Sequence, residues 1–521
     1  MTKYACKDEK DNTEIEIQPI GYMPEAVFCE STGDFSLPEY MPEIGKMLKV
    51  EPRILSTGRY IGADRAEFSG SVVYSVLYTG EDGEPFYTTL SGDYEYTVPL
   101  GEASDAERVE IYDETSLDSI SVRASGPRRI SVRARIKAQP HIMYEKKDGS
   151  QDAYRVEDES YQVLEESYTE RYHRHFESGE LELSDVFSPS SSPDIEPIGC
   201  DGWAVVSEIV FSNNAVICRG DAEYRVLYFD VSGGERRLHS TKKKLRFEHA
   251  TEISGVCAGA GARATARVIS AEMSRAEGQS DISITIRLNI IGELTTEKKR
   301  SYVCDVYSCT HELDVEKKTH RYRSGGVCKN FNFSYHAQKK FPEGMAVSDV
   351  CASYGEAKIE SVEMKNGVAH VCGSICVDCI LMESVGGSHE YSCLSVPMPF
   401  KCELALDGAS EEYELSIVPE VSGVRVRMDR DCVSADAELY LCTLISGVES
   451  RTIVDKTEVL RARPARPSAI TVYYPDKGES LWSVCKKYSV SLASVRSVNE
   501  GADIPSAADG TLDGVGRILI V

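Results

Sequence analysis

The chain has 521 residues and a formal net charge of −26, from 58 basic and 84 acidic side chains. This balance argues against nucleic-acid binding, which needs a basic face, and the length fits about three or four domains. Apolar runs stay shorter than the roughly 18 residues of a membrane-spanning helix. Residues 1–10 lack the apolar stretch of a signal peptide. We therefore expect a cytoplasmic protein without an integral membrane segment.

The 17 cysteines are numerous for a chain of this length. In a reducing compartment such cysteines are expected to be free thiols rather than a disulfide framework. The densest group lacks the spacing of a zinc knuckle, so we expect its thiols to pack as small apolar groups and to bind no metal. This group consists of Cys372, Cys376, Cys379, Cys393 and Cys402.

Most of the chain consists of one unit that occurs three times. The segment 70–78 recurs at 220–228 and, in a degraded form, at 373–381, so the copies are 150 and 153 residues apart. A second segment follows each copy, at 130–136, 282–288 and 433–439. All six segments alternate apolar and polar residues, which is typical of half-buried strands. The glycine that opens each first segment predicts a bulge or a close approach of the backbone.

Turn signals between these segments, such as Asn366-Gly367 and Gly386-Gly387, favour antiparallel pairing. The sequence therefore predicts a mainly β protein with three tandem β-sandwich-like modules. We place an N-terminal segment at 1–30, the repeats at 31–145, 181–300 and 336–450, connectors at 146–180 and 301–335, a linker at 451–468 and a small domain at 469–521.

The connectors and the linker differ in charge. Residues 141–187 contain 13 acidic and 5 basic side chains, which indicates a solvated connector with some edge strand or, alternatively, an acidic docking strip. The stretch 461–467 alternates arginine with proline and alanine. Because proline stiffens a linker, we expect it to hold the last domain away from the third module, with binding to an anionic surface as the alternative.

Residues 469–521 predict a small α+β domain in the order strand, helix, helix, strand (βααβ). Ser480 is a candidate N-cap, and Leu481, Val484, Cys485 and Tyr488 then form one apolar stripe. Ser491 can cap a second helix, and Asn499 suits its end, where a left-handed residue is common. The flanks 470–474 and 517–521 are rich in β-branched and aromatic residues and are predicted strands.

The run 473–488, Tyr-Tyr-Pro-Asp-Lys-Gly-Glu-Ser-Leu-Trp followed by a helix that ends in Lys-Tyr, resembles a LysM domain. This resemblance implies a shallow groove between the loop before the first helix and the loop after the second. The groove would bind a partner or a glycan. Trp482 can contact a partner there or, alternatively, cover the edge of the core. The candidate groove residues are Gly478, Glu479, Ser480, Leu481, Trp482, Asn499 and Ile504.

Three repeats ahead of such a tail, with the segments 37–44 and 70–78, resemble the SPOCS-domain family of spore coat morphogenetic proteins. The resemblance implies a mother-cell protein at the forespore surface. Its tail would bind a coat morphogenetic ATPase of the SpoIVA type, and self-association is a further expectation.

Catalytic signatures are missing from the sequence. It has neither a Gly-x-Ser-x-Gly elbow nor a phosphate-binding Gly-Lys-Ser/Thr loop, and His173 and His175 lack an evident third ligand for a metal. We therefore expect a non-enzymatic scaffold in spore coat or envelope assembly, without a cofactor. The alternative is a cell-wall or cortex protein that binds peptidoglycan or N-acetylglucosamine.

Overall fold

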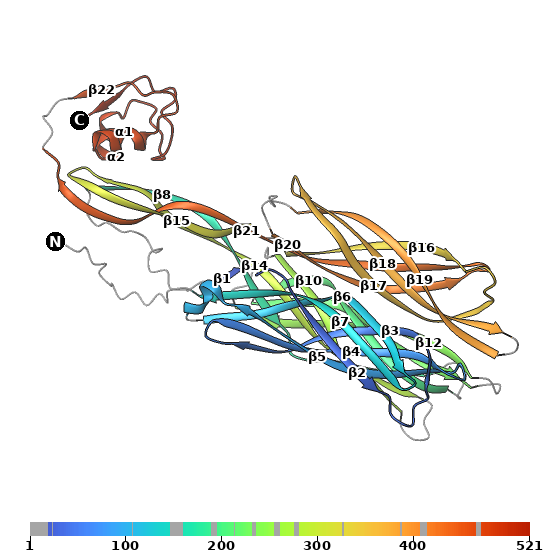
Figure 1. Ribbon diagram of the computed structural model, residues 1–521. Coiled ribbons are helices and arrows are strands. Elements are labelled where there is room, and N and C mark those ends of the chain that lie inside the picture. The colour runs from blue at the N-terminus through green and yellow to red at the C-terminus, as the bar shows by residue number, and fades with distance from the viewer. Residues whose placement is uncertain are drawn as a thin grey trace. The chain divides into compact units, whose positions relative to one another are not determined.

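The computed structural model divides the chain into two compact units, which are drawn in Figure 1. Unit one comprises 1–147, 172–296 and 326–446, and unit two comprises 148–171, 297–325 and 447–521. The structure describes residues 19–22, 24–106, 108–145, 160–188, 195–212, 214–231, 236–254, 261–275, 281–325, 328–385, 388–406, 414–464 and 470–521. The predicted turn at 386–387, residues 189–194 near the start of the second repeat and residues 465–469 at the end of the Arg/Pro linker lie outside these ranges.

The prediction of a mainly β protein is confirmed, since strands dominate the described residues and the α-helices found there are two short ones near the C-terminus. In the first repeat, one antiparallel sheet has the order β3-β4-β5, and a second has the order β1-β7-β2 with β6 also paired to β7. The strands are β1 (Pro19–Tyr22), β2 (Val27–Ser36), β3 (Ile44–Ile61), β4 (Arg65–Gly80), β5 (Pro85–Pro99), β6 (Arg108–Gly126) and β7 (Arg129–Glu145), with a 3₁₀ helix at Gly101–Asp105.

The second and third repeats use the same plan. Their three-stranded sheets are β10-β11-β12 and β17-β18-β19, and their four-stranded sheets are centred on the long strands β14 and β21. The strands are β8 (Tyr161–Glu177), β9 (Leu181–Phe187), β10 (Ile195–Ser212), β11 (Ala215–Asp230), β12 (Arg237–Glu252), β13 (Gly261–Ser274), β14 (Ile282–Ser308), β15 (His311–Gly325), β16 (Cys328–Lys340), β17 (Val347–Lys365), β18 (Val368–Val385), β19 (Ser388–Ala405), β20 (Glu414–Met428) and β21 (Cys432–Ala462).

Each repeat has its own apolar core between its two sheets. In the first repeat, for example, Tyr74 of β4 and Ile136 of β7 are buried in one cluster. The equivalent clusters of the other repeats join β11 to β14 and β18 to β21. Alternate residues of each central strand are buried there, which is the pattern that the period-two alternation predicted.

The repeated glycines lie where a side chain has no room. Gly70, Gly220 and Gly373 each face an aromatic residue on the next strand, Tyr94, Phe247 and Phe400 respectively. A Cβ on Gly220 would come within 2.1 Å of a backbone oxygen and 2.5 Å of the Phe247 ring. In all three repeats the preceding strand has a register shift opposite this glycine. The close approach and the bulge that the glycine predicted both occur.

The three repeats pack on one another within unit one through the same face of their central strands. Leu77, Leu227 and Ile380 occupy equivalent positions, seven residues after each glycine, and all three are buried in one shared cluster. The cluster also takes Leu48, Phe229, Leu238, Cys351, Ala352, Tyr354, Met382 and Tyr391. The repeats are therefore joined by a common apolar core and are not independent modules.

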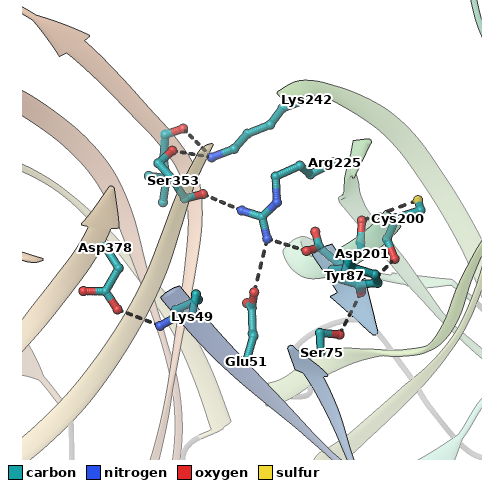
Figure 2. A network of polar contacts seen from close by, with 11 residues as sticks. Lys49, Glu51, Ser75, Tyr87, Cys200, Asp201, Arg225, Lys242, Ser353 and Asp378 are labelled. Atoms are coloured by element: carbon teal, nitrogen blue, oxygen red, sulfur yellow. Dashed lines mark hydrogen bonds and ion pairs between the residues drawn. The ribbon is translucent and has the colours of Figure 1, made fainter. Parts of the chain in front are cut away.

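Two residues closer to the glycine, the equivalent positions hold Ser75, Arg225 and Asp378. Figure 2 shows these three side chains, each with its own polar partners: the Tyr87 hydroxyl donates to Ser75, and Asp378 pairs with Lys49. The guanidinium of Arg225 donates to Asp201 at 2.5 Å, to Glu51 of the first repeat at 3.1 Å and to the backbone of Ser353 in the third. Because Arg225 is almost completely buried, its charge depends on these acceptors.

Unit two is built largely from the segments that connect the repeats. Strand β8, the ends of β14 and β21, and β15 supply residues 160–171, 297–325 and 447–462, which we call the connector platform. Val303, Val306 and Val454 form its apolar core. The tail completes unit two with β22 (Thr471–Tyr473), α1 (Leu481–Tyr488), α2 (Leu492–Val498) and β23 (Ile518–Ile520).

Fourteen cysteines in the described ranges are free thiols. Cys379 and Cys402 of the dense group are buried, whereas Cys393 is exposed. Within the same ranges, no helix is long and apolar enough to cross a membrane.

Candidate functional site

The tail is held together by the capping residues that its sequence predicts. The Ser480 hydroxyl accepts from the backbone N–H of Ser483, and Ser491 does the same for Ser494, both at 3.1 Å. The left-handed residue is Ser489, after α1, with φ of 52°. Asn499 follows α2 with φ of −114°, so the expectation of a left-handed residue there is wrong: its side chain, not its backbone angle, closes the helix.

The first candidate loop is occupied by internal contacts. The backbone N–H of Gly478 donates to Asp513 at 2.8 Å, and Glu479 accepts from the Tyr473 hydroxyl at 2.7 Å. Gly478 also has φ of 81°, a conformation that favours glycine. Leu481 is completely buried in the tail core. Three of the predicted groove residues therefore have evident structural roles.

The second candidate loop is bonded to the first. Backbone N–H groups of Leu481 and Trp482 donate to Gly510 and Ala508, and that of Leu512 donates to Glu479, at 2.8 to 3.1 Å. Asn499 accepts from the N–H of Leu519 and donates to two carbonyl oxygens. Ile504 packs against the same core as Leu481. The backbone bonds draw together the two loops that would border a glycan groove.

Trp482 lies against the connector platform. Its side chain is 5% exposed, and its ring meets that of Tyr307 edge to face, with centroids 4.9 Å apart. The indole N–H donates to the carboxylate of Asp305 at 2.9 Å. Of the two roles considered for this residue, the geometry matches burial at the edge of a core.

Asp305 is the polar centre of this contact. The same carboxylate accepts from Lys486 of α1 at 2.5 Å and pairs with Lys317 of the platform at 3.2 Å. Burial acts to raise the pKa of this carboxyl, but the hydrogen bonds from these lysines and the indole lower it below its usual value. Asp305 therefore stays ionised while it bridges tail and platform.

Two further bonds join the tail to other parts of the platform. The Tyr307 hydroxyl donates to the carbonyl of Val490 at 2.7 Å, and the backbone N–H of Leu492 donates to the side chain of Gln162 at 3.1 Å. Leu164 and Cys309 of the platform pack on the same cluster as the helices. The sequence predicted strands for the repeats but gave no sign that these connector residues contact the tail.

Among the described residues of unit two, exposed apolar side chains gather on the outer face of the two-stranded sheet. Ile470, Val472 and Tyr474 point to this face and are 67, 46 and 68% exposed. Val472 pairs with Leu519, and Val521, two residues beyond Leu519, is 59% exposed. We call these five residues the free sheet face. Exposed apolar side chains that lie together are typical of protein-binding surfaces.

Comparison with known families identifies a match in the second repeat. Residues 194–274 match the family model described as SipL, SPOCS domain. The matched SPOCS segment spans β10 to β13 and includes both Gly220 and Arg225. This match supports a SipL-like sporulation protein. No curated protein and no solved structure matches the chain.

The SPOCS segment also borders a cavity of about 1010 Å³ between the three repeats. Arg263 of this segment pairs with Glu114 and Glu293, and Trp203 and Arg267 line the same space. Glu420 faces it from the third repeat, and burial raises the pKa of this carboxyl to about 8. His175, stacked on Tyr112, has its pKa lowered to about 3 by burial. Removing one partner of such a buried arginine–carboxylate pair would leave an uncompensated charge.

Proposed function

We propose that the chain is a non-enzymatic scaffold of spore coat assembly. It consists of three SPOCS-type β-sandwich modules and a LysM-like tail that binds a coat morphogenetic ATPase of the SpoIVA type. It acts in the mother cell at the forespore surface. The family match in the second repeat supports the sporulation role, and the glycines, bulges and aromatic residues common to the three repeats support the triplication.

The free sheet face carries the proposal that the tail binds a protein. A glycan would enter between the two loops, yet backbone bonds link these loops at Glu479, Leu481 and Trp482. The exposed surface is instead apolar, with Tyr474 as its largest side chain. Aromatic residues such as tyrosine are enriched at protein interfaces.

Two matched substitutions test this surface in the full chain. Val472 is 46% exposed on the free sheet face, and Val498 is 41% exposed on α2. Val472→Glu should weaken binding to the purified ATPase by tenfold or more, because it puts a charge into the apolar centre of the interface. Val498→Glu should change the affinity by less than twofold.

Titration with N-acetylglucosamine oligomers tests the alternative. The proposal predicts no saturable binding of these oligomers by the full chain. Micromolar binding of the oligomers, together with no binding of the ATPase, would reject it in favour of a cell-wall or cortex protein.

A further inference from the structure

The tail contacts the connector platform at several separate points. Three separate parts of the tail take part: α1 through Trp482, the turn after it through Val490, and the start of α2 through Leu492. Their acceptors and donors come from two strands, β8 and β14. Three bonds at different points fix both the position and the rotation of a small domain.

The chemistry of the central contact is selective too. One carboxylate, on Asp305, accepts from an indole N–H and from an ammonium group at the same oxygen. Charge-assisted hydrogen bonds with little exposure to water are stronger than ordinary surface pairs. The side chain of Asp305 is only 14% exposed, so breaking this contact leaves a poorly solvated charge.

We propose that the connector platform is the docking site of this chain's own tail, and that Trp482 is a positioning residue rather than a contact to the partner. The segments between the repeats therefore form the surface on which the tail docks. The docked tail presents its free sheet face while its indole stays covered. The docking itself is independent of the proposed function, whereas the presentation of this face to the ATPase rests on it.

A charge reversal outside the tail tests the docking in the full chain. Asp305→Lys puts a third cation beside Lys486 and Lys317, so the tail should leave the platform. Adding Lys486→Asp restores an opposite pair and should restore most of the docking. Asp314→Lys, on the exposed side of β15, makes the same charge change in the platform without touching the tail and is the control.

Two readouts follow the docking without any partner. In Asp305→Lys, hydrogen exchange should rise at least tenfold in peptides that cover 481–498, and the Cys485 thiol, buried in the shared core, should react faster with maleimide. Peptides from β11 and β18 should keep their protection, which shows that unit one is still folded. If Asp305→Lys leaves the exchange and the thiol unchanged, the proposed docking is wrong.

Addition of the ATPase separates presentation from inhibition. If the platform presents the tail, the ATPase should protect peptides of 470–474 and 517–521, while 481–498 keeps its protection. If the ATPase instead increases exchange at 481–498 and around Asp305, it displaces the tail, and the positioning role of Trp482 is overturned. If the ATPase does not bind but the charge reversal still releases the tail, the docking stands and the proposed function fails.

Discussion

Equivalent positions of the three central strands carry Ser75, Arg225 and Asp378, with Glu51, Asp201 and Tyr354 opposite them on the preceding strands. A threefold copy of one residue would place like charges together. The repeats instead hold one hydroxyl, one cation and one anion, and the guanidinium of Arg225 also lies 3.5 Å from the centre of the Tyr354 ring. The equivalent position thus carries a different side chain in each repeat, and Asp378 pairs with Lys49 while Arg225 pairs with Asp201 and Glu51.

Removal of Arg225 should be costly. Arg225→Met leaves Asp201 and Glu51 without their cation in a poorly hydrated site, so we expect the free energy of unfolding to fall by about 3–5 kcal/mol. Urea denaturation measures this change. Arg219→Met, on the exposed face of the same strand, should leave the unfolding free energy nearly unchanged, because Arg219 pairs with Glu208 and Glu248 in solvent. Equal losses in both variants would contradict the role of the network.

The buried carboxyl of Glu420 should make the free energy of unfolding decrease as the pH rises. Burial raises its pKa from 4.5 to about 8, so the folded state holds a proton that the unfolded state releases above pH 4.5. The stability that this proton provides is complete below pH 4.5 and is lost as the pH rises to about 8.

Glu420→Gln cannot lose that proton. Relative to the wild type, the variant should therefore gain stability between pH 5 and pH 9, as measured by urea midpoints at both values. Since His175 is present in both proteins, its own titration cancels in the comparison. A difference between the two proteins that stays constant with pH would show that Glu420 is already ionised in the fold.

Among the elements, the tail helices follow the sequence closely. Both begin directly after their predicted serine caps, and Leu481, Val484 and Cys485 of the predicted stripe are buried. Trp482 is buried as well, off the stripe, because the platform covers that side. The stripe faces the tail's own core, and the indole faces a surface that is distant in the sequence.

Truncation of a buried leucine in the stripe should destabilise the protein more than truncation of an exposed leucine. Leu481→Ala removes a fully buried side chain and should destabilise the tail by about 2–5 kcal/mol, because a cavity remains. Leu460→Ala, at a position that is 61% exposed on β21, should have little effect. Hydrogen exchange of peptides from 481–498 measures both. Similar exchange in the two variants would show that the tail core is placed wrongly.

The strands of the repeats could be predicted because alternation and the opening glycine are local signals. Residues 70–78, 220–228 and 373–381 all fall within the central strands β4, β11 and β18. The connector platform could not be predicted in the same way. Gln162 bonds to Leu492, 330 positions away, and Asp305 bonds to Trp482, 177 positions away. The periodicity of a sequence does not predict contacts over such separations. The cavity and the Arg225 network likewise depend on how the repeats meet.

At the scale of the whole molecule, the shared cluster around Leu77, Leu227 and Ile380 gives the three repeats one common apolar core. Modules without shared contacts would unfold independently, whereas modules that share one apolar core are expected to unfold in a single transition. Exchange measured at increasing denaturant should therefore show β4, β11 and β18 losing protection at the same concentration. Loss of protection in β18 well before β4 and β11 would contradict this account.

The scaffold proposal also concerns where the molecule goes during sporulation. In this proposal, the repeats form one body and the docked tail binds a coat protein through its apolar sheet face. The chain should therefore be found where that coat protein assembles. Binding through the free sheet face should therefore determine localisation, and a single charge on that face should abolish it while the fold remains.

Fluorescence microscopy of the tagged chain in sporulating cells tests this most directly. The wild type should form a ring around the forespore, Val498→Glu should form the same ring, and Val472→Glu should spread through the mother cell. A wall pattern in vegetative cells, or a ring that persists in Val472→Glu, would contradict the proposal that the tail binds a coat protein through this face.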